Sequence, residues 1–136
     1  MNISQAAKIS GLSAKTIRYY ESIGLIAAPH REDNGYRCYQ QKDLDVLRFI
    51  QRARATGFSV DECRQLVSLY QNPSRQSSEV KELVQEKLQR VAAQIADLQH
   101  LRMTLEQLVS HCAGNEAAQC GIIDTLAEQE SDPESA

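Results

Sequence analysis

The spacing of apolar and polar residues near the N-terminus predicts two short helices. The first covers residues 4–10 and is expected to end at Gly11, because glycine commonly follows the last turn of a helix. Ser13 then caps a second helix over residues 14–22. Two short helices joined by a short turn that contains glycine predict a helix-turn-helix. The side chains expected to face the core are Ala6, Ala7, Ile9, Ile17 and Tyr20.

A different pattern follows after a turn signal, in which every second residue belongs to the same set and the two sets alternate. Asn34-Gly35 is the strongest short signal for a hairpin turn. Residues 36–40 then alternate with the period of a short strand. We therefore expect a small β-hairpin, or wing, beside the helix-turn-helix.

Helical spacing resumes near Gln41 and continues to Gly57. The sequence from Ser59 to Glu62 is a capping box, which predicts a further helix that ends before Pro73. The apolar positions of these two helices are Leu44, Leu47, Ile50, Ala53, Cys63, Leu66, Val67 and Tyr70.

Residues 78–111 contain neither glycine nor proline and predict one helix of roughly 50 Å. Apolar residues recur along it at alternating intervals of four and three, the pattern of a coiled-coil seam. A solvated helix of this length has nothing in its own chain to bury such a stripe, so we expect a second copy of the chain to cover it. The seam residues are Val84, Leu88, Val91, Ile95, Leu98, Leu105 and Val109, with Arg102 at one place in the series.

These elements predict a mainly α chain with a winged helix-turn-helix domain and a long antiparallel coiled-coil helix. The expected parts are the winged domain over 1–70, a hinge over 71–77, the dimerisation helix over 78–111, a loop and short helix over 112–128, and an acidic, disordered tail over 129–136.

The 136 residues carry a net charge of −3, but the charges are unevenly divided. Residues 1–70 hold ten Lys and Arg against seven Asp and Glu, whereas residues 71–136 hold five against eleven. The first part can therefore face phosphate, which the second cannot.

Aromatic residues make up 5% and Trp is absent, which argues against a large enzyme-like core. No signal peptide or apolar run near the roughly 18 residues of a membrane span is present, so we expect a cytoplasmic protein without membrane association.

The outer face of the second helix and the wing carry the residues expected to contact DNA. Such groups can read base edges in the major groove and contact phosphates. Taken singly, scattered Lys and Arg are more often a solvated face, but helix-turn-helix spacing together with a basic wing favours DNA. The candidate residues are Lys15, Arg18, Tyr19, Arg31, Tyr36, Arg37, Tyr39 and Arg54.

Cys112 and Cys120 are the candidate metal ligands. In reducing cytosol, paired cysteines more often bind metal or carry out redox chemistry than form structural disulfides. Their spacing is not that of a closed zinc site, and two thiolates suit a soft ion of low coordination number such as Cu(I). The alternative is two unrelated cysteines near a flexible end. His111 could add a ligand, and we expect Cys38 and Cys63 to be small buried apolar groups.

Four segments carry a resemblance to a known family: residues 17–21 (IRYYE), 24–26 (GLI), 34–39 (NGYRCY) and 54–59 (RATGFS). They closely resemble the MerR family of transcriptional regulators, and the match extends over nearly the whole chain. With the two cysteines of the loop, the chain is similar to the copper-efflux branch of that family. The resemblance implies a homodimer on double-stranded promoter DNA, which distorts the promoter for RNA polymerase when Cu(I), Ag(I) or Au(I) binds. The implied target genes encode export or detoxification of the metal.

The resemblance also gives a role to Ser77. Members that respond to zinc, lead or mercury usually carry a cysteine at the start of the dimerisation helix, and here that place is Ser77. The missing thiolate implies selectivity for a monovalent ion, although Ser77 can equally be a helix cap. Copper-type members often have proline where this chain has Ala113 and Gly121. A regulator of organic ligands and a thiol oxidoreductase are the alternatives, and neither a further ligand domain nor a Cys-x-x-Cys motif supports them.

Overall fold

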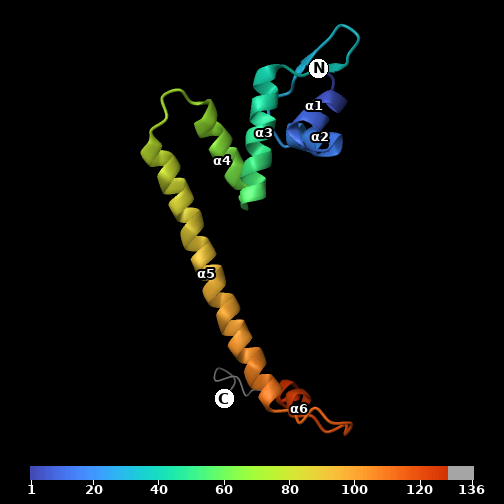
Figure 1. Cartoon of the computed structure of the whole chain (residues 1–136), viewed down its shortest axis with the longest axis vertical. Helices are drawn as coiled ribbons and strands as arrows, with labels where there is room; N and C mark the ends of the chain where they lie inside the picture. Colours follow the sequence, from blue (N-terminus) through green and yellow to red (C-terminus); the bar gives the residue numbers. More distant parts are fainter. Residues whose placement is uncertain (129–136) are drawn as a thin grey trace, which may run out of the picture. The chain divides into compact units, whose positions relative to one another are not determined.

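The structure is a computed structural model that describes residues 1–128, so the predicted tail lies outside the described residues. Figure 1 shows the elements in order along the chain. They are α1 (Ile3–Ser10), α2 (Ala14–Ser22), β1 (His30–Arg31), β2 (Arg37–Cys38), α3 (Gln41–Thr56), α4 (Val60–Gln71), α5 (Ser77–Ser110) and α6 (Gly121–Ala127). The first compact unit is Met1–Val84, and the second begins at Gln85, within α5.

The two N-terminal helices form where the sequence predicts them, because local caps fix their ends. The Asn2 side chain accepts a hydrogen bond from the Gln5 backbone and begins α1, while Gly11, at φ 79°, ends it in the left-handed conformation. Ser13 begins α2 by accepting from the Thr16 backbone N–H. The helix-turn-helix prediction is thus confirmed.

The core of the first unit consists of two groups of buried side chains that share α3. Leu44 and Leu47 of α3 belong to one group, and Val46 and Ile50 belong to the other. The remaining members are Ala6, Ile17 and Tyr39 in the first group and Tyr20, Leu25, Cys63 and Val67 in the second.

Two predicted core positions are wrong. Ile9 is 40% exposed, because α1 buries Ala6 and Ser10, which lie one turn apart on a different face. The Ser10 hydroxyl tolerates burial because it accepts from the backbone N–H of Leu12 at 3.3 Å. Cys38 is only half-buried, because it lies in a wing of two short strands that has no further strand beside it in residues 1–128.

The wing is an antiparallel pair in which Arg31 lies opposite Arg37. Its turn contains Gly35 at φ 83°, whose N–H donates to the Glu32 carbonyl at 2.8 Å. The Asn34 side chain accepts from the Tyr36 backbone N–H at 3.0 Å, which closes the turn. The hairpin prediction is therefore confirmed.

The long helix α5 begins one residue earlier than predicted, so Ser77 is its first residue. Most predicted seam residues are exposed in the single chain, with Leu88 at 66% and Leu98 at 64%. Within residues 1–128, none of the helices has the length and hydropathy to cross a membrane. This stripe is apolar surface of α5 that is exposed to water, and a second surface packed against it would bury that area.

We expect Leu47→Ala to lower the free energy of unfolding by about 2–5 kcal/mol, because Leu47 is fully buried and its removal leaves a cavity. Arg48→Ala, at the next and exposed position of α3, is the control and should change stability by no more than about 0.5 kcal/mol. Urea unfolding followed by circular dichroism measures both. Equal effects of the two variants would contradict the assignment of α3 as the central core helix.

Candidate nucleic-acid interface and metal site

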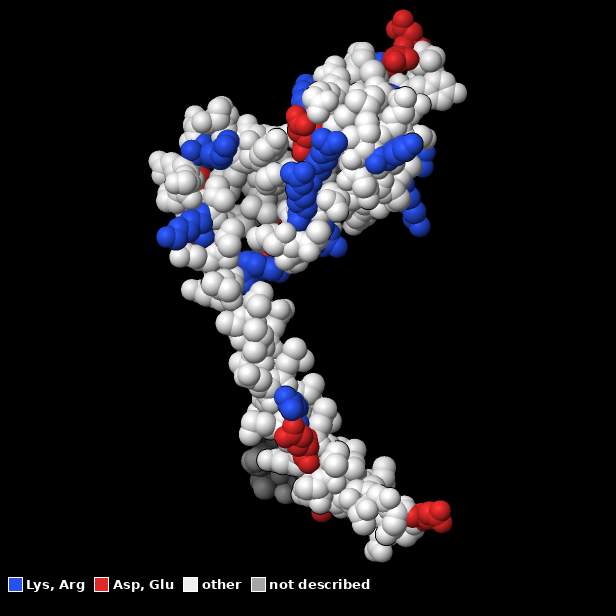
Figure 2. Space-filling model, viewed as in Figure 1, with Lys and Arg blue, Asp and Glu red and all other residues white. Residues whose placement is uncertain are grey.

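The outer face of α2 is set by the residues on its inner face. Ile17 and Tyr20 are buried, so the helix cannot turn about its axis without exposing them. Lys15, Arg18 and Tyr19 consequently lie on the exposed side, and the Tyr19 side chain is 54% exposed. Figure 2 shows Lys and Arg side chains gathered on the first unit, with few along α5.

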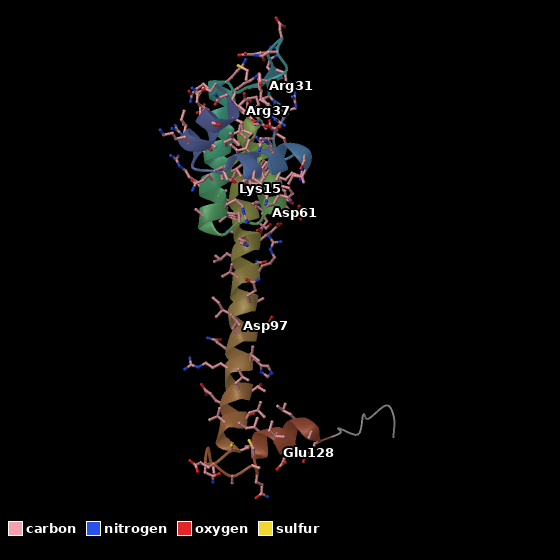
Figure 3. The ribbon with its side chains drawn as sticks, turned by 90° about the vertical axis from the view of Figure 1, so that its right-hand side faces the viewer. Lys15, Arg31, Arg37, Asp61, Asp97 and Glu128 are labelled. Atoms are coloured by element: carbon pink, nitrogen blue, oxygen red, sulfur yellow. The ribbon has the colours of Figure 1, made fainter. Side chains whose placement is uncertain are left out.

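One cleft of the first unit brings together predicted DNA contacts from separate elements. Arg18 of α2 lines it together with Arg31, Tyr36 and Arg37 of the wing. Glu32 is the one acidic residue among its lining side chains. Figure 3 labels Arg31 and Arg37 close together on the wing. A cleft with three guanidinium groups and an exposed tyrosine ring has the donors that a phosphate backbone requires.

Glu21 connects α2 to the wing through Arg37, which lines this cleft. Its carboxylate accepts from Arg37 Nε at 2.9 Å, and the Tyr39 hydroxyl donates to its other oxygen. The Glu21 side chain is 10% exposed and the Arg37 side chain 27%, so this ion pair is partly shielded from water. The sequence reading missed Glu21, although it lies four residues after Ile17, on the same inner face of α2.

Tyr39 must be removed from the predicted DNA-contacting set. It is 2% exposed and belongs to the core, so its ring does not face a ligand. Burial raises the pKa of the Tyr39 hydroxyl, and its hydrogen bond to Glu21 and the Glu21 charge raise this pKa further. The hydroxyl therefore stays protonated and remains a donor to Glu21 at neutral pH.

Two arginines outside the cleft bind the backbone of the same unit. Arg54 Nη1 donates to the Phe58 carbonyl at 2.8 Å, so this predicted DNA contact is also part of the connection from α3 to α4. Arg64 Nη2 donates to the Ile23 carbonyl at 2.9 Å and thereby holds the end of α2 against α4. The sequence reading missed Arg64, because a long-range contact of this kind has no local signal.

The cysteine loop closes at the end of α5. Cys112 follows the last turn of α5, Cys120 precedes α6, and their Sγ atoms are 3.1 Å apart. Both side chains are half-buried. The backbone N–H of Ile123 lowers the pKa of the Cys120 thiol, and the Cys112 side chain and the N–H of Ile122 lower it further. The loop thus presents two sulfur atoms side by side, and the pKa of one of the two thiols is lowered.

The donor set around this pair fits a soft ion bound by two thiolates. Across residues 1–128, His, Cys, Asp and Glu form no group of three or more with a geometry for binding metal. His111 Nδ1 lies 3.5 Å from Thr125 Oγ1 and belongs to no such group. Two sulfurs without a third donor suit a monovalent soft ion better than zinc, which takes four ligands.

The other two cysteines lie in the first unit. Cys63 is fully buried, and burial raises the pKa of its thiol, which agrees with its predicted role as a small apolar core residue. Ser77 is exposed at the start of α5, also in the first unit. Its predicted role in choosing the ion stays a prediction.

Comparison with known proteins gives two family matches that together cover most of the chain. The family described as "MerR HTH family regulatory protein" matches residues 1–69, and the one described as "MerR, DNA binding" matches residues 44–108.

Individual relatives match over nearly their whole length. The HTH-type transcriptional regulator HmrR of Rhizobium leguminosarum bv. viciae is 50% identical, over 94% of this chain and 98% of that protein. The regulator CueR of Yersinia pestis is 45% identical, over 93% of this chain and 91% of that protein. Among solved structures, the regulator PbrR691 of Ralstonia metallidurans CH34 in complex with lead(II) superposes with a TM-score of 0.85 at 34% identity, covering 93% of this chain and 99% of that one.

The hydrogen bond from Tyr39 to Glu21 leads to a double-mutant test. Glu21→Ala should lower the free energy of unfolding by about 1–3 kcal/mol, because it leaves the buried Tyr39 hydroxyl without its acceptor. Adding Tyr39→Phe should recover part of that loss, because the unsatisfied hydroxyl is then gone. Chemical unfolding of both single variants and the double variant measures the coupling. Strictly additive losses would contradict a hydrogen bond that stabilises the fold.

Proposed function

Because the chain belongs to the MerR family of DNA-binding transcriptional regulators, a family of regulators and not of enzymes, we propose that it is a metal-responsive activator of coinage-metal export or detoxification genes. It binds promoter DNA as a homodimer. Cu(I), or alternatively Ag(I) or Au(I), binds Cys112 and Cys120 and changes how the dimer holds the DNA.

The observation that carries this proposal is the isolated sulfur pair at the end of α5. The Sγ atoms of Cys112 and Cys120 are 3.1 Å apart, and the lowered pKa of the Cys120 thiol favours the thiolate that a metal requires. These two residues would hold the ion, and the bound ion would supply the cross-link between the end of α5 and the start of α6.

The ligand residues, and not the likeness of fold to solved structures, support the choice of a monovalent ion. The relative that superposes with a TM-score of 0.85 is in complex with lead(II), so likeness of fold alone selects no ion. Two thiolates are sufficient ligands for a monovalent soft ion, whereas a divalent ion usually takes further ligands. A serine at position 77 supplies no thiolate from the start of α5.

The wing and α2 support binding to double-stranded DNA. In the proposed complex, α2 enters the major groove with Lys15, Arg18 and Tyr19 toward the bases and phosphates. Arg31 and Tyr36 of the wing contact the adjacent phosphate backbone. The basic first unit agrees with this orientation, since its residues 1–70 carry an excess of Lys and Arg.

The exposed stripe of α5 supports the homodimer. A second copy of the chain, antiparallel to the first, would bury Leu88, Ile95, Leu98 and Leu105, which are each at least half exposed in one chain. A dimer places two DNA-reading units on one promoter, where RNA polymerase also binds. Bending of DNA costs about 1–6 kcal/mol, and coupling between ligand sites is typically about 1–3 kcal/mol, so ion binding is of the right size to shift the promoter between two forms.

A pair of variants separates the two halves of this proposal. Cys112→Ser should weaken Cu(I) binding by at least about 100-fold, because it removes one of two donors, while promoter binding of the metal-free protein stays as in wild type. Arg18→Ala should do the opposite and lose about 1–3 kcal/mol of DNA-binding free energy at unchanged Cu(I) affinity. Competition with a Cu(I) chelator and DNA binding at fixed salt measure the two effects. Undiminished Cu(I) affinity in Cys112→Ser would refute the metal site.

A second prediction concerns the choice of ion. Ser77→Cys should increase the transcriptional response to Zn(II) or Hg(II), because a further thiolate supplies the donor that divalent ions seek. Ser78→Cys places the same thiol one residue further along α5 and is the matched control. A promoter-reporter assay over a series of ions makes the comparison. An unchanged profile in Ser77→Cys, or the same change in both variants, would count against a selector role for position 77.

A further inference from the structure

One carboxylate of α2 binds two side chains on the wing side of the first unit. Glu21 Oε2 accepts from Arg37 Nε at 2.9 Å, and Glu21 Oε1 accepts from the Tyr39 hydroxyl. Arg37 and Tyr39 are two residues apart in the extended segment that contains β2, so both point to the same side of it, toward α2. Two contacts restrict both the position of this segment beside α2 and its rotation, which a single contact would not.

The rest of the wing follows β2, because its own contacts hold it together. β1 pairs with β2, and Arg31 Nη1 donates to the Gly35 carbonyl at 3.0 Å. The Gly35 N–H donates to the Glu32 carbonyl and closes the turn. A shift of β2 relative to α2 would therefore carry Arg31 and the turn with it.

Core packing fixes the inner end of this segment, whereas Glu21 fixes its outer part. The Tyr39 ring is buried, but the Arg37 side chain is 27% exposed and lines the cleft. Within residues 1–128, the side-chain hydrogen bonds that join α2 to this segment end on Glu21. Glu21 does not itself line the cleft, so a ligand there meets Arg37 and not the carboxylate. The direction in which Arg37 faces a ligand consequently depends on Glu21.

Recognition of a duplex by α2 and the wing together requires a defined spacing between them. In the proposed complex, α2 enters the major groove while the wing contacts the phosphate backbone beside it. Phosphate contacts carry no sequence information, but they set the register in which a helix meets the bases. A wing that shifts relative to α2 would still bind phosphate, yet it would no longer restrain where α2 lies in the groove.

We propose that Glu21 is a positioning residue that determines specificity: by holding the wing at one spacing from α2, it raises the preference of the protein for its own DNA sequence over other sequences. This inference rests on the proposed DNA-binding mode of α2 and the wing. Glu21 contacts no DNA in that mode and acts through Arg37 and Tyr39.

Two simpler effects of losing the carboxylate treat all DNA sequences alike. Removal of one negative charge near phosphate raises the affinity for every duplex. Loss of folded protein lowers binding to every duplex, since the unfolded chain binds none of them specifically. Only a change of spacing lowers the affinity for the preferred sequence relative to that for an unrelated one.

The test measures binding of the full chain to two duplexes at the same salt concentration. One duplex is selected from a random-sequence pool by the wild-type protein, and the other has the same sequence scrambled. The ratio of the two affinities should fall by about 10-fold or more in Glu21→Ala. It should stay within about threefold of wild type in Glu21→Gln, because the amide oxygen can accept from Arg37 Nε while the amide NH₂ donates to the Tyr39 hydroxyl oxygen.

Glu32→Ala is the matched control, because it removes the same charge from a residue that lines the cleft and keeps the backbone that closes the turn. Its affinity ratio should stay within about threefold of wild type. An equal fall in Glu32→Ala and Glu21→Ala would overturn the proposal, as would a wild-type ratio in Glu21→Ala or a Glu21→Gln variant as impaired as Glu21→Ala.

The double variant Glu21→Ala with Tyr39→Phe separates positioning from stability. The second substitution removes the unsatisfied hydroxyl and should recover part of the lost stability, but it restores no link between α2 and the wing. The affinity ratio should therefore stay low in the double variant. A ratio that recovers together with the stability would show that Glu21 only stabilises the fold and would overturn the proposal.

Arg18→Ala in the same assay distinguishes failure of this inference from failure of the proposed function. If Arg18→Ala loses affinity for the selected duplex while Glu21→Ala keeps the wild-type ratio, only the positioning role of Glu21 fails. If Arg18→Ala binds the selected duplex as wild type does, the proposed binding mode of α2 fails, and this inference fails with it.

Discussion

The apolar side chains of α3 face away from water on two sides of the helix. Leu44 and Leu47 pack with α1, α2 and the residue after the wing, whereas Val46 and Ile50 pack with α4 and the end of α2. A fully buried side chain of this kind contributes about 1.5–3 kcal/mol, so these four together exceed any single polar contact in the unit. The placement of the candidate DNA-reading helix α2 depends on this two-sided burial.

Polar contacts add to the core packing and fix α2 relative to the wing and to α4. Glu21 links α2 to the wing through Arg37 and Tyr39, and Arg64 links the end of α2 to α4 through the Ile23 carbonyl. Each contact joins segments distant in sequence, so local shifts of the wing relative to α2 require breaking shielded hydrogen bonds. The Glu21 contacts therefore tie the wing, which lines the cleft, to α2.

The sequence predicted the helices and the wing because their signals are local. Capping residues such as Ser13 and the Asn-Gly turn act within a few positions, and heptad spacing marked the exposed stripe of α5. It did not predict that Tyr39 is a core residue or that Gly121 approaches the His111 carbonyl, because both depend on packing between distant segments. The cysteine spacing indicated a pair, but only folded coordinates give the 3.1 Å between the sulfurs.

The ion pair between Arg37 and Glu21 also affects how salt acts on the surface of the cleft that Arg37 lines. Arg37 enters any encounter with DNA as half of a nearly neutral pair, since Glu21 already compensates its charge at 2.9 Å. Release of counterions from DNA follows the number of phosphates that uncompensated cations neutralise, with a log–log slope of about 0.9 for each. In the proposed complex with DNA, Arg18 and Arg31 would therefore carry more of the ionic-strength dependence than Arg37, whose charge Glu21 already compensates.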